Sequence, residues 1–227
     1  MTIDAVFFGS LGAIAEISEF QRRAYNFAFA EADLEWVWDR DSFHHMLKIP
    51  GGRARMANFA AATGDPVDTD ALYSRALAHL RLILARQAPA PRPGVLDTIW
   101  AARAAGIRVV LISDAEPALV DIVIGGLAPH LGPDAFDWIG AGETVATPRP
   151  APDRYARAIA AFALRPADAV AIEDTPEGAM SARAAGLDVL AFPGEAMRDR
   201  VFPLGVTVTC HLRPAAIGLD QPELAAE

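Results

Sequence analysis

Two adjacent carboxylates, Glu173 and Asp174, are the clearest candidates for chemistry in this sequence. They follow the apolar run 170–172 and precede Thr175, which can cap a helix, and Pro176, which suits a first helical turn. Carboxylates at the end of a strand can coordinate a hard cation or neutralise a basic side chain. The spacing alone also allows an acidic surface turn that has no chemical role.

A glycine pair followed by two basic side chains forms a second candidate. Gly51 and Gly52 precede Arg53 and Arg55, and glycine amides beside guanidinium groups can bind an anion such as phosphate. Alternatively, the two arginines simply begin a solvated helix. Lys48, three residues before the glycines, is the single lysine of the chain, so a site that needs an amine has one candidate.

Other reactive residue types favour structural roles. His44 and His45 are adjacent, so they cannot share one helical face as metal ligands. Gly9 and Gly12 follow an apolar run but lack the full glycine spacing of a dinucleotide-binding loop. The single cysteine, Cys210, excludes an internal disulfide and fits a reducing compartment, so we expect a cytoplasmic protein.

Length and charge limit the function classes that remain. The 227 residues, 52% of them hydrophobic, are enough for one large core with a small attached domain. With 20 basic and 29 acidic residues the net charge is -9, so we expect no nucleic-acid or membrane-surface binding. The apolar run 5–15 is too short to span a bilayer, and it favours a buried first strand over a signal peptide.

The periodicity of apolar residues predicts two kinds of segment. After a first strand at 5–8, every periodic segment up to about residue 87 is helical, and a proline-rich connector follows at 88–94. Beyond it helices alternate with short apolar runs, predicted as strands at 108–112, 136–139, 169–172, 189–192 and 206–209. This alternation predicts an α/β fold with a parallel sheet, which binds ligands at the carboxyl ends of its strands.

The stretch from Val170 to Leu187, which contains Glu173 and Asp174, closely resembles the fourth motif of the haloacid dehalogenase (HAD) superfamily, in its helical-cap subgroup. Residues 91–94, 109–113 and 148–153 match other parts of that family in order. Segments 22–26, 36–38 and 51–56 resemble the cap of CbbY-type phosphatases, which are related to β-phosphoglucomutase and phosphoglycolate phosphatase.

The resemblance covers nearly the whole chain and implies the domain organisation. We expect a doubly wound, Rossmann-like parallel sheet as the core, with an inserted all-helical cap domain. Residues 1–15 and 91–227 would form the core, and residues 16–90 would form the cap.

The first motif departs from the family pattern. In the family the first strand ends in Asp-x-Asp-Gly, where the first aspartate attacks phosphorus, the second is the general acid and base, and Mg²⁺ is held by the first aspartate and the fourth motif. Here Gly9 stands at the nucleophile position and Leu11 at the acid/base position. Loss of a nucleophile costs on the order of 10⁶ in rate, so we expect no phosphoaspartyl chemistry. Ser10, between them, is expected to point its hydroxyl to the opposite face.

At three other positions the residue is the same as in the family or has similar chemistry. Arg149 replaces the third-motif lysine, Ser113 keeps the second-motif hydroxyl, and Glu16 is retained. We expect Arg149 to pair with Asp174 or Glu173. Two carboxylates and one guanidinium sum to a charge of about -1, which is also the net charge of an intact family site with its Mg²⁺. The metal positions Glu173 and Asp174 would thus be vestigial or weak, and no cofactor would be needed.

The resemblance therefore implies a catalytically inactive protein that binds phosphate or a small phosphorylated metabolite. The ligand-binding residues would be Ser113, Arg149, Gly51, Gly52, Arg53, Arg55 and Glu16. One alternative is a Mg²⁺-dependent phosphatase of small sugar phosphates with a non-standard site, for instance a water in the space left by Gly9 and activated by Glu16. Another is a protein-interaction module with a vestigial cleft.

Overall fold

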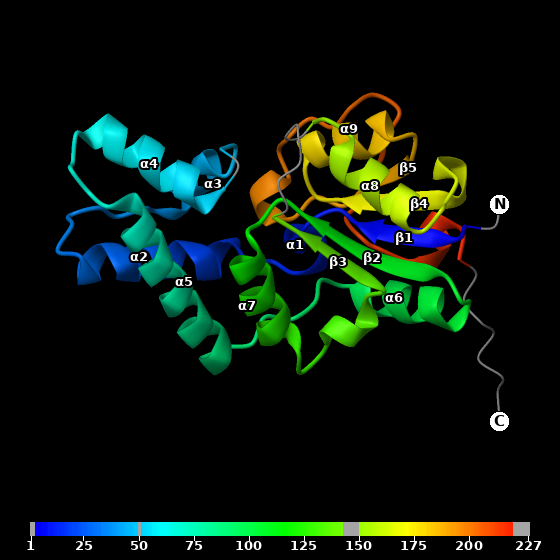
Figure 1. Ribbon diagram of the computed structural model, residues 1–227, viewed down its shortest axis with the longest axis horizontal. Helices are drawn as coiled ribbons and strands as arrows, with labels where there is room; N and C mark the ends of the chain where they lie inside the picture. The colour runs from blue at the N-terminus through cyan, green and yellow to red at the C-terminus, as the bar shows by residue number, and fades with distance from the viewer. Residues whose placement is uncertain (1–2, 50, 143–149, 220–227) are drawn as a thin grey trace.

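A six-stranded parallel sheet forms the centre of one half of the molecule, as the computed structural model shows for residues 3–49, 51–142 and 150–219 (Figure 1). Its order is β3-β2-β1-β4-β5-β6, with β1 near the middle. The predicted α/β, doubly wound fold is confirmed. The strands are β1 (Ala5–Phe8), β2 (Arg108–Ser113), β3 (Trp138–Ala141), β4 (Ala169–Glu173), β5 (Asp188–Ala191) and β6 (Thr207–Val208).

Helices cover both faces of this sheet (Figure 1). Alternate side chains of β1 explain the two layers, because successive side chains of a strand point to opposite faces. Val6 and Phe8 belong to the core packed under α6 and α7, whereas Ala5 and Phe7 pack with Tyr155 of α8. The covering helices are α6 (Val95–Ala104), α7 (Pro117–Leu127), α8 (Asp153–Ala161) and α9 (Pro176–Ala184), and the short α1 (Leu11–Ile14) follows β1.

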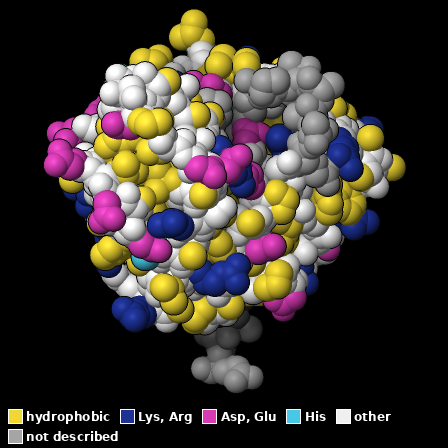
Figure 2. Space-filling model, turned by 60° about the vertical axis from the view of Figure 1, so that its left-hand side comes forward, with side chains coloured by type: hydrophobic (Ala, Val, Ile, Leu, Met, Phe, Trp, Pro, Cys, Tyr) yellow, Lys and Arg dark blue, Asp and Glu magenta, His cyan; other side chains and the backbone are white. Residues whose placement is uncertain are grey.

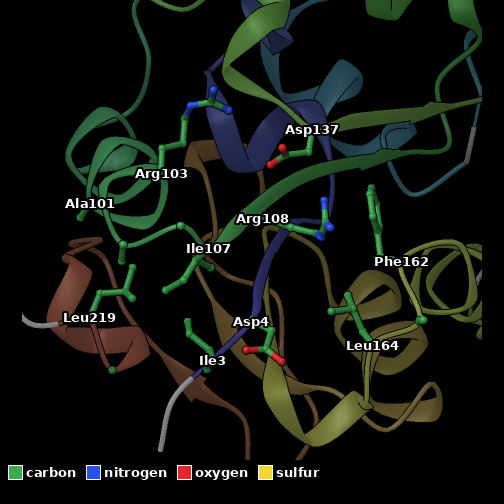
Figure 3. Close-up of a pocket in the computed structure, with 14 residues that line it drawn as sticks. Ile3, Asp4, Ala101, Arg103, Ile107, Arg108, Asp137, Phe162, Leu164 and Leu219 are labelled. Carbon is green, nitrogen blue, oxygen red and sulfur yellow. The ribbon is translucent and has the colours of Figure 1, made fainter.

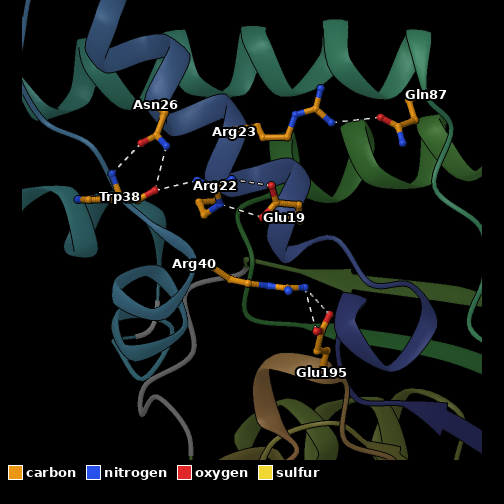
Figure 4. A network of polar contacts seen from close by, with 8 residues as sticks. All are labelled: Glu19, Arg22, Arg23, Asn26, Trp38, Arg40, Gln87 and Glu195. Carbon is orange, nitrogen blue, oxygen red and sulfur yellow. Dashed lines mark hydrogen bonds and ion pairs between the residues drawn. The ribbon is translucent and has the colours of Figure 1, made fainter.

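The other half of the molecule is a group of four helices, called here the helical segment: α2 (Ser18–Glu31), α3 (Arg40–Met46), α4 (Gly52–Thr63) and α5 (Thr69–Arg86). An aromatic cluster that includes Phe29, Trp38 and Phe43 fills its interior. The Asn26 amide makes two 2.9 Å hydrogen bonds with the backbone of Trp38 (Figure 4). Trp38 is fully buried in this cluster.

Several contacts join the helical segment to the α/β part. Leu80 and Leu84 on the second half of α5 pack into the core beside α7. An ion pair of 2.8 Å links Arg40 of α3 to Glu195, in a short 3₁₀ turn (Glu195–Met197) after β5 (Figure 4). These contacts hold the helical segment next to the carboxyl ends of the strands (Figure 1).

The ends of β2, β4, β5 and β6 lie within one residue of their predicted positions, whereas both ends of β3 lie two residues later. β3 begins at Trp138, two residues later than predicted, because a 3₁₀ turn (Pro133–Ala135) precedes it and the Asp137 carboxylate accepts a 2.8 Å hydrogen bond from Val109 N. β6 contains only Thr207 and Val208. Within the described ranges, no helix has the length and apolar character needed to cross a membrane.

Candidate functional site

The register of the central strands places the first and fourth motifs side by side. β1 and β4 are neighbours, with Phe8 opposite Ile172, and Gly9 N donates a 2.8 Å hydrogen bond to Ile172 O. Position 9 therefore lies next to Glu173 at the carboxyl ends of both strands. β2 and β4 flank β1 on opposite sides, which makes this the topological switch point where ligands of such sheets bind.

The side chain of Glu173 fills the space beside Gly9. Glu173 is completely buried, and the hydroxyl of Tyr155 donates a 2.5 Å hydrogen bond to its Oε1. A Cβ atom at position 9 would overlap both the Glu173 carboxyl group and the Tyr155 hydroxyl, and a Cβ at Gly178 would overlap the same carboxyl group. The two glycines thus provide the room that Glu173 occupies.

Asp174 faces the opposite way and borders a cavity. Its Oδ1 accepts a 2.5 Å hydrogen bond from Ser10 Oγ, and its carboxyl group lies against Gly12. Ser10 is the N-cap of α1, where its Oγ also accepts a 3.3 Å hydrogen bond from Ala13 N. The expectation that this hydroxyl points away from the site is therefore wrong, because the chain leaves the strand and starts a helix at Ser10.

The acid/base position of the family holds only an aliphatic side chain here. Leu11 is 4% exposed and packs into the hydrophobic core while it borders the cavity. It has no proton to donate or accept, so no acid or base catalysis starts from this position.

A cavity of about 590 Å³ lies between the helical segment and the carboxyl ends of the strands. Most predicted site residues meet there: Glu16, Gly51, Gly52, Arg55, Ser113 and Asp174 all contribute to its lining. Glu173 is buried beside the cavity and is absent from that lining. Arg149 and its predicted pairing with the two carboxylates fall outside the described residues.

The helical segment supplies positive groups to the cavity. Gly52 begins α4, a helix of 12 residues, so the positive end of the helix dipole faces this region. Arg55, only 6% exposed, donates a 3.0 Å hydrogen bond to Ile49 O, while its Nε has no hydrogen-bond partner among the described residues. Lys48, the single lysine of the chain, also lines the cavity. The sequence alone did not assign a function to it.

Arg53, predicted as a ligand-binding residue, lies outside the lining of the cavity. Its Nε is 2.8 Å from Glu116 of the α/β part, and its Nη1 contacts Asp70. The hydrogen bond with Glu116 raises the pKa of Arg53 above its ordinary value. The structure therefore places Arg53 as a link between the helical segment and the loop after β2.

The loop after β2 contains an ion pair that sequence reasoning missed. Ser113 Oγ accepts a 3.1 Å hydrogen bond from Ala115 N, which shapes the turn. Arg154 lies 2.6 Å from Asp114 and donates a 3.2 Å hydrogen bond to Ser113 O. Since Arg154 follows the third motif by one residue, its distance from Asp114 in the sequence concealed this pairing.

Arg92 is a second residue whose role the sequence did not reveal. It is buried and donates hydrogen bonds of 2.9, 2.7 and 2.8 Å to the carbonyl oxygens of Gly12, Phe192 and Pro193. Burial lowers the pKa of Arg92 below its ordinary value, and the carboxylate of Glu16, 3.6 Å away, opposes this shift. Arg92 thereby fixes the turn after β1. In the sequence, only the match of residues 91–94 to the family drew attention to this residue.

The donor groups near the switch point suit a magnesium ion poorly. The described residues contain no group of three or more His, Cys, Asp or Glu side chains arranged to hold a metal. Glu173 accepts the Tyr155 hydrogen bond inside the protein, and Asp174 accepts the one from Ser10. A hard cation prefers several oxygen ligands at one point, and these two carboxylates face different surroundings.

A second hollow, of about 960 Å³, lies at the opposite ends of the strands (Figure 3). Arg108 there lies over the ring of Phe162, with Asp4 and Asp137 nearby. The space-filling view shows acidic and basic side chains mixed over the face it displays, with no continuous basic area (Figure 2).

Comparison with known proteins supports the same assignment of the fold. A family model for haloacid dehalogenase-like hydrolases matches residues 3–186. The protein CbbY of Rhodobacter capsulatus is 35% identical over 206 residues, which are 89% of this chain and 90% of that protein.

Two crystal structures of CbbY from Rhodobacter sphaeroides are also similar. One, in complex with phosphate, is 30% identical with a TM-score of 0.83, and the match covers 92% of this chain and 95% of that one. The other, an aspartate-to-asparagine mutant in complex with xylulose 1,5-bisphosphate, is 31% identical with a TM-score of 0.84 and the same coverage. The chain therefore belongs to the haloacid dehalogenase-like hydrolase family, as a member of CbbY type.

Proposed function

We propose that this protein binds a small phosphorylated metabolite in the cavity and does not hydrolyse it through a phosphoaspartate. The observation that carries the proposal is the position of Glu173. Its side chain, hydrogen-bonded to Tyr155, fills the volume that a nucleophile at position 9 would need. The CbbY structures with phosphate and with xylulose 1,5-bisphosphate support a ligand of this chemical class.

Glu173 does not take over the missing nucleophile's role. Its side chain is 0% exposed and does not line the cavity, so a phosphorus atom cannot approach its carboxylate. The same packing argues against the alternative of a nucleophilic water at Gly9, because Glu173 and Tyr155 already occupy that space. Glu16, the suggested base, instead accepts a 2.9 Å hydrogen bond from Glu195 N.

In this proposal residues 16–90 act as a cap and residues 1–15 and 91–227 as the core. The phosphate lies at the start of α4, near Gly51 and Gly52, where Arg55 and Lys48 supply positive charge. Backbone N–H groups at a helix N-terminus and nearby cations are a general means of anion binding. Ser113 of the core and Glu16, the first residue of the cap range, also line this cavity.

Magnesium has no part in this binding. Members of the family typically use Mg²⁺, which would act as a Lewis acid on phosphate, but the described donors fit it poorly for the reasons given above. Glu173 and Asp174 are then vestigial ligands, and the cavity binds its anion through amide and cationic groups alone.

A thermal-shift screen of sugar mono- and bisphosphates tests the proposal. At least one phosphorylated sugar should raise the Tm by the same amount in EDTA and in excess Mg²⁺, because binding stabilises the folded state without a metal. The unphosphorylated sugars serve as controls and should leave the Tm unchanged. If no phosphorylated compound raises the Tm, the vestigial-cleft alternative is supported instead.

A second candidate is a phosphohydrolase with a non-standard site. The 2.5 Å hydrogen bond between Ser10 Oγ and Asp174, at the edge of the cavity, favours it, because a carboxylate can accept the proton of a serine hydroxyl. This candidate requires phosphate release from a sugar phosphate that depends on Mg²⁺ and is abolished by Asp174→Ala. The first candidate requires that neither be observed.

A further inference from the structure

The edge of the sheet at β6 carries strongly exposed apolar side chains. Leu204 and Val201, 95% and 89% exposed, are the two most exposed large apolar residues in the described part of the chain. Val208, in β6 itself, is 54% exposed. Proteins commonly protect a sheet edge with charged side chains, yet residues 201–210 contain no charged residue. An apolar edge of this kind is typical of a surface that contacts another chain.

Two contacts hold the segment before β6 against α9. Arg200 lies 2.6 Å from Glu177, and Arg183 donates a 2.5 Å hydrogen bond to the carbonyl oxygen of Leu204. Met180 lies on the same side of α9, three residues from both Glu177 and Arg183. The exposed side chains next to these contacts are called here the apolar edge: Met180, Val201, Leu204 and Val208.

The backbone of β6 directs polar groups away from the sheet. β6 is the last strand in the sheet order, and Thr209 N donates a 2.8 Å hydrogen bond to Ala191 O of β5. Neighbouring residues of a strand direct their N–H and C=O groups to opposite sides, so those of Val208 point away from β5. Backbone groups on such an edge can pair with a strand of another chain.

A second copy of this chain matches the edge in both geometry and charge. With a two-fold axis at Val208, the two β6 strands run antiparallel, and each Val208 N–H donates to the Val208 C=O of the other copy. The same rotation brings the two apolar edges together, as in an isologous dimer. The net charge of -9 makes two copies repel each other, which favours a contact at residues 201–210, where no charge is present.

We propose that the protein forms a two-fold symmetric homodimer in which the β6 strands pair at Val208 and the apolar edges pack against each other. A stable interface buries about 800 Å² per partner, more than the side chains of the apolar edge supply alone. The dimer is therefore weak, with a Kd on the order of 10 µM. It leaves the cavity accessible, because the cavity lies at the carboxyl ends of the strands and not at the edge of the sheet.

Sedimentation velocity of the full-length protein, from about 1 to about 200 µM, tests the dimer. The mass should rise from that of a monomer to that of a dimer. Leu204→Lys and Val208→Lys, which place a charge in the apolar edge, should each weaken dimerisation at least about tenfold. Val37→Lys is the matched control, because Val37 is 74% exposed but lies in the loop between α2 and α3, and this variant should dimerise like the parent.

Three results would overturn the proposal. These are a parent protein that stays monomeric at about 200 µM, equal effects of all three lysine substitutions, and assemblies larger than a dimer, which a closed two-fold contact does not form. Circular dichroism of each variant should match the parent, because the substituted side chains are exposed.

Hydrogen–deuterium exchange, resolved to single amides, separates strand pairing from contact through side chains alone. Exchange at Val208 should slow when the protein concentration rises from below to above the Kd, because its N–H then donates to the other copy. Exchange at Val37 should stay the same. A Val208 amide that exchanges equally fast in monomer and dimer would overturn the pairing of the two β6 strands.

Discussion

Replacement of Gly9 by aspartate, which restores the family nucleophile, is expected to destabilise the protein and to produce no phosphatase. Its Cβ would overlap Glu173 and Tyr155, and its carboxylate would lie against a buried carboxyl group. Overpacking and uncompensated buried charge each cost a few kcal/mol, so we expect the free energy of unfolding to fall by about 3 kcal/mol. Urea denaturation followed by circular dichroism measures this loss.

Two further variants separate overlap with Glu173 from a general effect of aspartate. Gly125→Asp introduces the same side chain on α7, where an added Cβ meets no other atom, and it should change stability by less than about 0.5 kcal/mol. The double variant Gly9→Asp with Glu173→Gly should recover part of the loss, since it vacates the occupied volume. A Gly9→Asp protein as stable as the parent would show that Glu173 does not occupy this space.

Removal of the Tyr155 hydroxyl should have the second largest effect. Tyr155→Phe deletes the 2.5 Å hydrogen bond to the completely buried Glu173. Loss of a partner of a buried carboxylate costs about 2 kcal/mol, and the ring itself stays in its core position against Phe7. The same urea denaturation should therefore show a lower midpoint with an unchanged slope.

Tyr73→Phe provides the matched control for this substitution. Tyr73 is also buried, but its hydroxyl forms no hydrogen bond that the described part of the structure records, so its removal should cost less than about 0.5 kcal/mol. Equal effects of the two tyrosine substitutions would mean that the Glu173 contact contributes nothing to stability.

Much of the fold could be predicted because the pattern of apolar residues changes at residue 88. Helical periodicity before that point and alternation of helices with short apolar runs after it correspond to α2–α5 and to the sheet. The predicted ends of helices and strands were less accurate where local side-chain contacts determine the end of an element. The late start of β3, set by the 3₁₀ turn at Pro133–Ala135 and the Asp137 hydrogen bond, is an example.

The sequence predicted which residues lie near the cavity better than it predicted the contacts that these residues make. The motif pattern identified Asp174, Gly52 and Arg55, which meet at the cavity. It gave no reason to connect Tyr155 with Glu173, because that contact depends on how α8 packs on the sheet. The family resemblance also predicted that Arg53 binds the ligand, whereas two carboxylates, Asp70 and Glu116, hold it outside the cavity lining.

In the function that we propose, the glycine at position 9 and the position of Glu173 belong to one arrangement. Gly9 and Gly178 leave a space that the side chain of Glu173, at the end of β4, occupies. Under the proposed function, such a core keeps the fold and the cavity without a carboxylate that attacks phosphorus. Binding without turnover is the activity that we propose for it.

The most direct test of this account is a ³¹P NMR time course under single-turnover conditions. The protein, in excess over a sugar phosphate that raises its Tm and with Mg²⁺ present, should show a shifted ligand resonance and no inorganic phosphate over a day. Accumulation of inorganic phosphate that requires Mg²⁺ and disappears in Asp174→Ala would contradict the account.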